Sequence, residues 1–92
     1  MTKHCLFALG QVVSTPNALE LMTKKHIDLF TLLHRHQTGD WGDLNETDRE
    51  VNEDALVTHS RILSSYLFGQ DKIWIITEAD RSLTTILLPQ DY

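Results

Sequence analysis

Several residue types that define whole classes of proteins are scarce in this chain. Cys5 is the single cysteine among 92 residues, so no disulfide can form within the chain. A lone cysteine favours a reducing compartment, and we expect a cytoplasmic protein. The apolar runs, such as residues 73–76 and 86–88, are far shorter than the ~20 residues of a membrane-spanning helix. The sequence therefore predicts one domain, residues 1–92, with no membrane association.

Basic residues are also few, with eight Lys and Arg against thirteen Asp and Glu. Their one cluster is Lys24–Lys25, which His26 follows, and this is too small for the basic stripe that a phosphate backbone requires. The four glycines, at positions 10, 39, 42 and 69, form neither a dinucleotide-binding fingerprint nor a phosphate-binding loop. We therefore expect no direct contact with nucleic acid and no nucleotide cofactor.

Five histidines raise the question of a metal site. His34 and His36 are two residues apart, which on a helix turns them about 200° away from each other. No second cysteine and no H-E-x-x-H pattern accompany them. We predict ordinary surface or capping histidines, with no metal and no cofactor.

The first half of the chain predicts one strand followed by helices. Residues 6–14 have the apolar, weakly charged composition of a strand. Thr15 is a suitable N-cap, and Pro16 suits the first position of a helix that ends near residues 24–25. Asp28 is a second candidate N-cap, for a helix over residues 29–36. The alternative is one long helix over residues 16–37.

The second half predicts a turn, a helix and three strands. Residues 38–44 contain two glycines and two aspartates and predict a turn, after which Asn45 can cap a helix that runs to Leu56. Three runs rich in β-forming residues then follow, at residues 61–68, 72–78 and 82–89, and hairpin-length gaps separate them. The fold class is therefore α+β. We expect a small antiparallel sheet, made of the N-terminal strand plus a three-stranded meander, with two or three short helices on one face. The edge at which the first strand joins stays open.

The densest chemical signal is acidic. Residues 39–54 contain seven carboxylates and one arginine, a charge of −6, whereas the whole chain has a formal charge of −5. Such a segment is either a solvated helix face or a surface that attracts a basic protein. Trp41 lies inside the segment, where it either plugs the core or adds apolar area to a contact. The contact hypothesis assigns partner binding to Asp40, Trp41, Asp43, Glu46, Asp48, Glu50, Glu53 and Asp54.

Three blocks of the sequence carry a resemblance. They are LGQVVSTPNALE at residues 9–20, RHQTGDWGDL at residues 35–44 and WIITEADRSLTTILLPQDY at residues 74–92. Together they resemble a family of small proteins carried on plasmids, phages and other mobile elements. The chain departs from that family between the first two helices, where His26, Asp28 and Leu29 stand in place of a glycine and a serine–proline pair.

The chain is also similar in profile to anti-CRISPR proteins, some of which occupy the basic nucleic-acid path of a type I effector complex. The resemblance implies a bacterial host cell and a non-enzymatic inhibitor that binds a basic surface of effector subunits. Two alternatives remain. One is a small hydrolase or nuclease that uses Glu78 and Asp80, with His36 and Asp40. The other is a homo-oligomeric accessory protein that buries the second face of the meander through Trp74.

Overall fold

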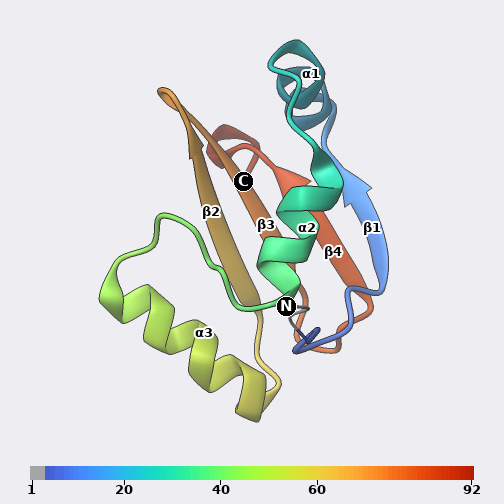
Figure 1. Cartoon of the computed structure of the whole chain (residues 1–92). Helices are drawn as coiled ribbons and strands as arrows, with labels where there is room; N and C mark the ends of the chain where they lie inside the picture. Colours follow the sequence, from blue (N-terminus) through green and yellow to red (C-terminus); the bar gives the residue numbers. More distant parts are fainter. Residues whose placement is uncertain (1–3) are drawn as a thin grey trace.

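The computed structural model describes residues 4–92, in which three helices lie around a four-stranded sheet (Figure 1). Along the chain the elements are β1 (Gln11–Ser14), α1 (Pro16–Lys24), α2 (Leu29–Gln37), α3 (Glu46–Thr58), β2 (Ile62–Phe68), β3 (Asp71–Thr77), β4 (Leu83–Leu87) and the short 3-10 helix η1 (Pro89–Asp91). The α+β class is confirmed. Within the described residues, no helix has the length and apolar character to cross a membrane.

Each α-helix begins at the cap that its sequence predicts. Thr15 Oγ1 accepts from the Ala18 N–H at 3.2 Å, Asp28 Oδ1 from Phe30 at 3.0 Å, and Asn45 Oδ1 from Asp48 at 2.8 Å. These bonds satisfy amides that have no partner inside the helix. The chain breaks between α1 and α2 at His26, which has a φ of 54°. Two helices therefore form instead of one long helix.

The sheet has the order β1-β4-β3-β2, which confirms the C-terminal meander. β1 joins at the β4 edge and runs parallel to β4, so the sheet is mixed and the expectation of a wholly antiparallel sheet was wrong in this pair. The connection from β1 to β4 contains all three helices and two strands. A parallel pair needs such a crossover, and a hairpin cannot supply it.

The first strand is also shorter than predicted, because it begins at Gln11 and not at residue 6. The preceding segment pairs with the end of α2: the Leu6 N–H donates to the Gln37 carbonyl at 2.8 Å, and Gln37 Nε2 donates to the Phe7 carbonyl at 2.8 Å. Gly10 separates the two parts, with a φ of 65° and its Cα against the backbone of Ser82. A side chain at this position would collide with that backbone, so the glycine permits the change of direction.

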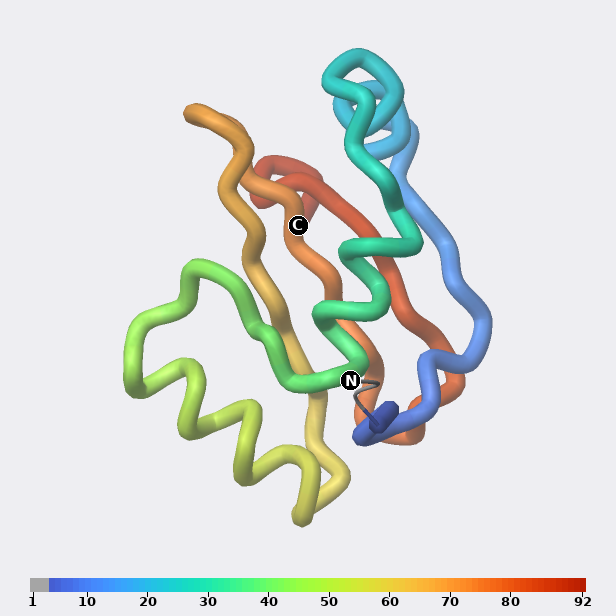
Figure 2. Tube along the Cα trace, in the orientation of Figure 1, coloured from blue at the N-terminus to red at the C-terminus, as the bar shows by residue number. Residues whose placement is uncertain are grey.

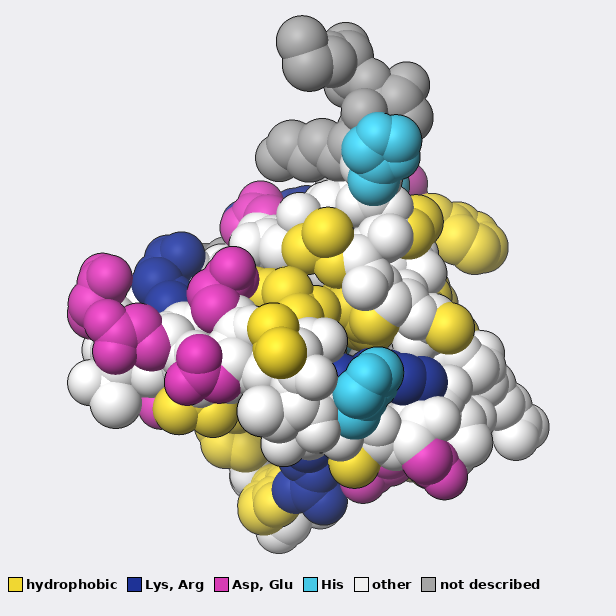
Figure 3. Space-filling view, turned by 90° about the horizontal axis from the view of Figure 1, so that it is seen from below, with side chains coloured by type: hydrophobic (Ala, Val, Ile, Leu, Met, Phe, Trp, Pro, Cys, Tyr) yellow, Lys and Arg dark blue, Asp and Glu magenta, His cyan; other side chains and the backbone are white. Residues whose placement is uncertain are grey.

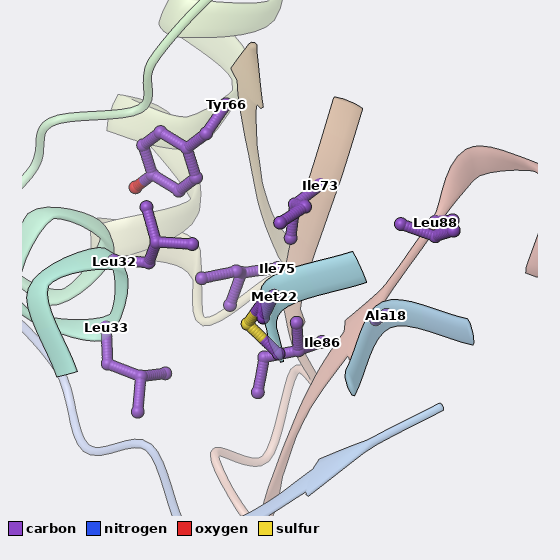
Figure 4. Close-up of a cluster of buried hydrophobic side chains, with 9 residues drawn as sticks. All are labelled: Ala18, Met22, Leu32, Leu33, Tyr66, Ile73, Ile75, Ile86 and Leu88. Carbon is purple, nitrogen blue, oxygen red and sulfur yellow. The ribbon is translucent and has the colours of Figure 1, made fainter. Parts of the chain in front are cut away.

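The main core lies between the sheet and the pair of helices α1 and α2. Figure 4 shows its side chains pointing toward one another. They are Ala18, Met22, Leu32, Leu33, Tyr66, Ile73, Ile75, Ile86 and Leu88. In contrast, α3 lies beside β2, at the margin of the sheet (Figures 1 and 2). A smaller cluster of Trp41, Ala55 and Ile62 fills the space beneath it.

The C-terminus covers part of the opposite face of the sheet. The Tyr92 ring meets the half-buried Trp74 ring edge-on, with centroids 5.9 Å apart, and the Tyr92 hydroxyl accepts from Arg61 at 2.9 Å. Asp91 accepts from the Thr15 hydroxyl and from Asn17, both at 2.7 Å, which ties η1 to the start of α1. Tyr92 therefore occupies part of the surface that the oligomer hypothesis gave to another copy.

Candidate functional site

The acidic segment divides into two parts with different environments. The loop before α3 contributes Asp40, Trp41 and Asp43, and α3 itself contributes five carboxylates. Seen from below, the acidic side chains gather on the side of the molecule that α3 occupies (Figure 3). The loop part is bonded within the molecule, whereas most of the helix part faces solvent.

Asp40 pairs with a cation of its own chain. Arg35 Nε donates to Asp40 Oδ2 at 2.7 Å, and a second nitrogen of the same guanidinium lies 3.3 Å from Asp40 Oδ1. This two-point contact raises the pKa of Arg35, and the guanidinium also lies over the Tyr66 ring at 4.5 Å. The Tyr66 hydroxyl donates to the Asp40 carbonyl at 2.7 Å. Asp40 therefore anchors the loop, and its charge is offset locally.

Trp41 is buried, with 2% of its surface exposed. Of the two alternatives, a side chain in the core and a side chain in a contact surface, the structure therefore shows the first. Its indole N–H donates to Glu53 Oε2 at 2.8 Å, and its ring stacks on Phe7 with centroids 6.3 Å apart. Gly42, the next residue, has a φ of 77° and lies so close to the Ser65 backbone that a side chain at this position would collide with it. The expectation that Trp41 adds apolar contact area was wrong, because little of the ring is accessible.

Asp43 and its neighbours cover the outer edge of β2. Asp43 Oδ2 accepts from the Leu67 N–H at 2.9 Å, and the backbone N–H of Asp43 donates to the Ser65 carbonyl at 2.6 Å. The Ser65 N–H donates to the Trp41 carbonyl at 3.1 Å. An edge strand otherwise presents such groups to any passing strand. The loop therefore works as a cover for the sheet.

Asn52 of α3 completes this cover, and nothing in the sequence marked it. Its side-chain amide donates to the Leu63 carbonyl at 2.6 Å and accepts from the Leu63 N–H at 3.1 Å. The amide thus copies the pairing of a neighbouring strand. Asn52 is 3% exposed on an otherwise polar helix, and no local pattern separates it from the solvent-facing residues.

Arg81 fixes the other end of α3. It lies in the β3–β4 turn with a φ of 61°, and its guanidinium donates to the carbonyls of Ala55, Ser60 and Glu78 at 2.6–3.0 Å. A cation at the C-terminal end of a helix also stabilises the helix dipole. The partners of its guanidinium are thus backbone carbonyls, which join the β3–β4 turn to the end of α3.

The remaining acids of α3 are exposed. Glu46, Asp48, Glu50 and Asp54 make no side-chain hydrogen bond or ion pair with any residue that the structure describes. Arg49, the one basic residue of the helix, donates to the carbonyls of Leu44 and Gly42 at 3.2 and 2.7 Å. Five carboxylates and one arginine give α3 a charge of −4, which leaves −1 for the rest of the chain. These acids keep their negative potential available to a partner.

The residues of the hydrolase hypothesis do not come together. His36 is completely buried on the helix-covered face, where its Nε2 lies 2.9 Å from Thr77 Oγ1. Glu78 follows Thr77 and therefore projects from the opposite side of the strand, where it pairs with Arg61 at 3.5 Å. Asp80 is exposed and accepts from the Ser82 hydroxyl at 2.6 Å, which lowers its pKa. Asp80 also accepts from the Ser82 N–H at 3.0 Å, so its carboxylate serves the β3–β4 turn.

His36 belongs to a buried polar chain whose protons can be placed. The Thr84 hydroxyl donates to the Leu9 carbonyl at 2.7 Å, so the Thr84 oxygen accepts from Thr77, also at 2.7 Å. Thr77 must then accept from His36 Nε2–H. Burial, with a smaller effect of the Arg81 charge, lowers the pKa of His36 from 6.5 to about 3, so the imidazole is neutral near pH 7. A neutral ring that is protonated at Nε2 accepts at Nδ1, where Ser64 Oγ lies 2.6 Å away.

The sequence contained a signal for this chain of hydroxyls. Three polar residues lie two positions from a core isoleucine, and therefore on the same face of their strand: Ser64, Thr77 and Thr84. A polar side chain on that buried face requires a buried partner. Among the described residues, no group of three or more His, Cys, Asp or Glu is arranged to hold a metal ion.

Comparison with protein-family models, with curated proteins and with solved structures gives no match to the chain.

Proposed function

We propose that the protein is a non-enzymatic, protein-binding inhibitor that places the acidic face of α3 against a basic, nucleic-acid-binding surface of another protein. The observation that carries the proposal is the set of unpaired carboxylates at Glu46, Glu50 and Asp54 on the exposed side of the helix. At 100° per residue, these three side chains lie within about 80° of one another around the helix axis. Val57, 80% exposed, lies between Glu46 and Glu50 in this projection and adds apolar area.

The attachment of α3 to the sheet supports the proposal. Asn52 and Arg81 tie the helix to the sheet at two points, so its carboxylates are displayed from a rigid support. A rigid surface loses little conformational entropy when it binds. Complementary charge speeds the encounter, and the buried contacts then slow release. The inhibitor would act by occluding the basic surface of its partner, where its carboxylates would occupy the positions that nucleic-acid phosphates otherwise take.

The resemblance to mobile-element proteins and to anti-CRISPR proteins extends the proposal to a target class. The expected partner is a type I CRISPR effector complex, bound on the subunits whose lysines and arginines line the nucleic-acid path. The revised contact set is Glu46, Asp48, Glu50 and Asp54, because Asp40, Trp41, Asp43 and Glu53 serve bonds within the molecule.

The test is binding of the purified protein to purified type I effector complexes at low and at high salt. The variant Glu46→Gln/Glu50→Gln/Asp54→Asn removes three charges that have no internal partner. If each contributes about 0.5–1 kcal/mol, affinity falls roughly 10- to 150-fold.

A matched control raises the net charge by the same three units elsewhere. Glu20→Gln/Gln70→Lys/Gln90→Lys changes exposed residues away from α3 and should bind like the wild type. Equal losses in both variants would mean that net charge alone drives association. Absence of binding to every such complex at low salt would contradict the proposed target class.

A further inference from the structure

β1 is the edge strand of the sheet on the side away from α3, and the outward backbone groups of this strand have no partner among the described residues. The Gln11 N–H donates to the Ser82 carbonyl at 3.0 Å, and the Thr15 N–H donates to the Ile86 carbonyl at 2.9 Å. Because strand backbone groups alternate in direction, Val13 also faces β4, whereas Val12 and Ser14 direct their N–H and C=O groups outward. No described residue hydrogen-bonds to these outward groups. Figures 1 and 2 show no element beyond β1 on this side.

The strand carries none of the charged or proline residues that protect many edges, and only its length of four residues limits pairing. Its sequence, QVVS, contains no charge and no proline, and Val12 is 37% exposed. Lysine, proline or a bulge would discourage another strand from pairing here. The outward groups of β1 lie at exposed residues, where water can bond to them, and they are also accessible to the backbone of another strand.

We propose that the partner is a second copy of this chain, whose β1 pairs with the first in antiparallel orientation. The two outward residues lie symmetrically about Val13, so a two-fold axis at Val13 sets Val12 of one copy opposite Ser14 of the other. Each such pair exchanges two N–H···O=C bonds. In this single register, β1 of the second copy satisfies all the outward donors and acceptors of Val12 and Ser14. The two four-stranded sheets become one continuous sheet of eight strands.

The distribution of charge is compatible with a second copy at this edge. The acidic helix α3 lies beside β2, at the far edge of the sheet from β1. In the dimer the two α3 helices therefore lie outside opposite ends of the continuous sheet, about 35 Å or more apart at ~4.8 Å per strand. This distance exceeds the screening length of about 8 Å at physiological salt, so the acidic surfaces do not oppose dimerisation. The inference is independent of the proposed function, because it uses neither α3 nor its target.

The register is tested with single cysteines in a Cys5→Ser background and a mild oxidant. In the proposed dimer Val13 faces its own copy as a non-hydrogen-bonded pair, at a Cα separation of about 4.5 Å that suits a disulfide. Val13→Cys should therefore crosslink to dimers. Gln11→Cys projects from the same face, but its two copies lie about 13 Å apart, and it should stay monomeric. Equal crosslinking at both positions would overturn the register.

Self-association is tested without covalent chemistry by sedimentation of the full chain over a range of concentrations. Val12→Lys puts a charge on the open edge and should weaken dimerisation at least tenfold. Leu67→Lys is the matched control, since Leu67 is 46% exposed on the edge strand β2, where Asp43 already occupies the outward N–H. A wild type that stays monomeric at the highest concentration, or equal effects of the two lysines, would overturn the proposal.

Discussion

The two edge strands of the sheet meet their surroundings in different ways. Along β2, every outward backbone group of Leu63 and Ser65 has a partner, and the Leu67 N–H is bonded to Asp43. Along β1, the corresponding groups of Val12 and Ser14 have none among the described residues. The cover of β2 is built from the loop and helix that carry the acidic segment. A segment that looks in sequence like one charged surface therefore has two roles, a structural one in its loop and at Asn52, and an exposed one on the outer side of α3.

The largest expected effect is the loss of stability in acid. His36 bonds to Ser64 of β2 and to Thr77 of β3, so protonation of its imidazole acts on the half of the sheet that contains the covered edge. In the folded state its pKa lies near 3, below the unfolded value of 6.5. The unfolded state therefore binds the proton first, and stability is full above pH 6.5 and is lost as the pH falls toward 3. A difference of this size corresponds to about 4–5 kcal/mol at the acid end.

The measurement is the free energy of unfolding in urea from pH 7 to pH 3.5, for the wild type and for His36→Gln. The variant should be less stable at pH 7, because it loses the hydrogen bonds of His36. It should lose less stability on acidification, because glutamine does not titrate. Parallel curves for the two proteins would mean that the imidazole is not held neutral. The exposed Asp80 and Asp91, whose pKa values are lowered by hydrogen bonds, contribute equally to both curves.

Removing the amide of Asn52 should have the next largest effect, since it breaks the cover of β2 at one residue. Asn52→Ala leaves the N–H and the C=O of Leu63 without partners beneath α3. Two such groups cost about 2–6 kcal/mol in the free energy of unfolding, measured in urea. Asn17→Ala removes a single exposed bond to Asp91 and should cost much less. Similar losses in the two variants would contradict the role of Asn52 as an edge cover.

Much of the fold follows from local sequence chemistry. Thr15, Asp28 and Asn45 mark three helix starts, and the spacing of the last three apolar runs predicts the meander. These features depend on residues close together in the chain, where caps and turns act directly on the backbone. The class of the fold was therefore accessible from the sequence.

The remaining features depend on contacts between distant residues. The parallel pairing of β1 with β4 and the docking of Asn52 on Leu63 both join segments that no local pattern relates. Trp41 shows the same difficulty for the site, because its charged neighbours indicate exposure while Ala55 and Ile62, later in the chain, enclose it. For this reason the sequence alone indicates one acidic surface, although only four of its carboxylates, those of Glu46, Asp48, Glu50 and Asp54, face solvent without partners among the described residues.

Amide hydrogen exchange, followed residue by residue, tests the contrast between the two edges most directly. The Leu63, Ser65 and Leu67 amides should be protected at every protein concentration, because their partners lie in the same chain. The Val12 and Ser14 amides should exchange quickly in dilute solution and become protected at high concentration. Asp43→Ala should free Leu67 alone, at a cost of about 1 kcal/mol. Fast exchange along β2, or protection of Val12 and Ser14 that does not change with concentration, would contradict the account of one covered and one open edge.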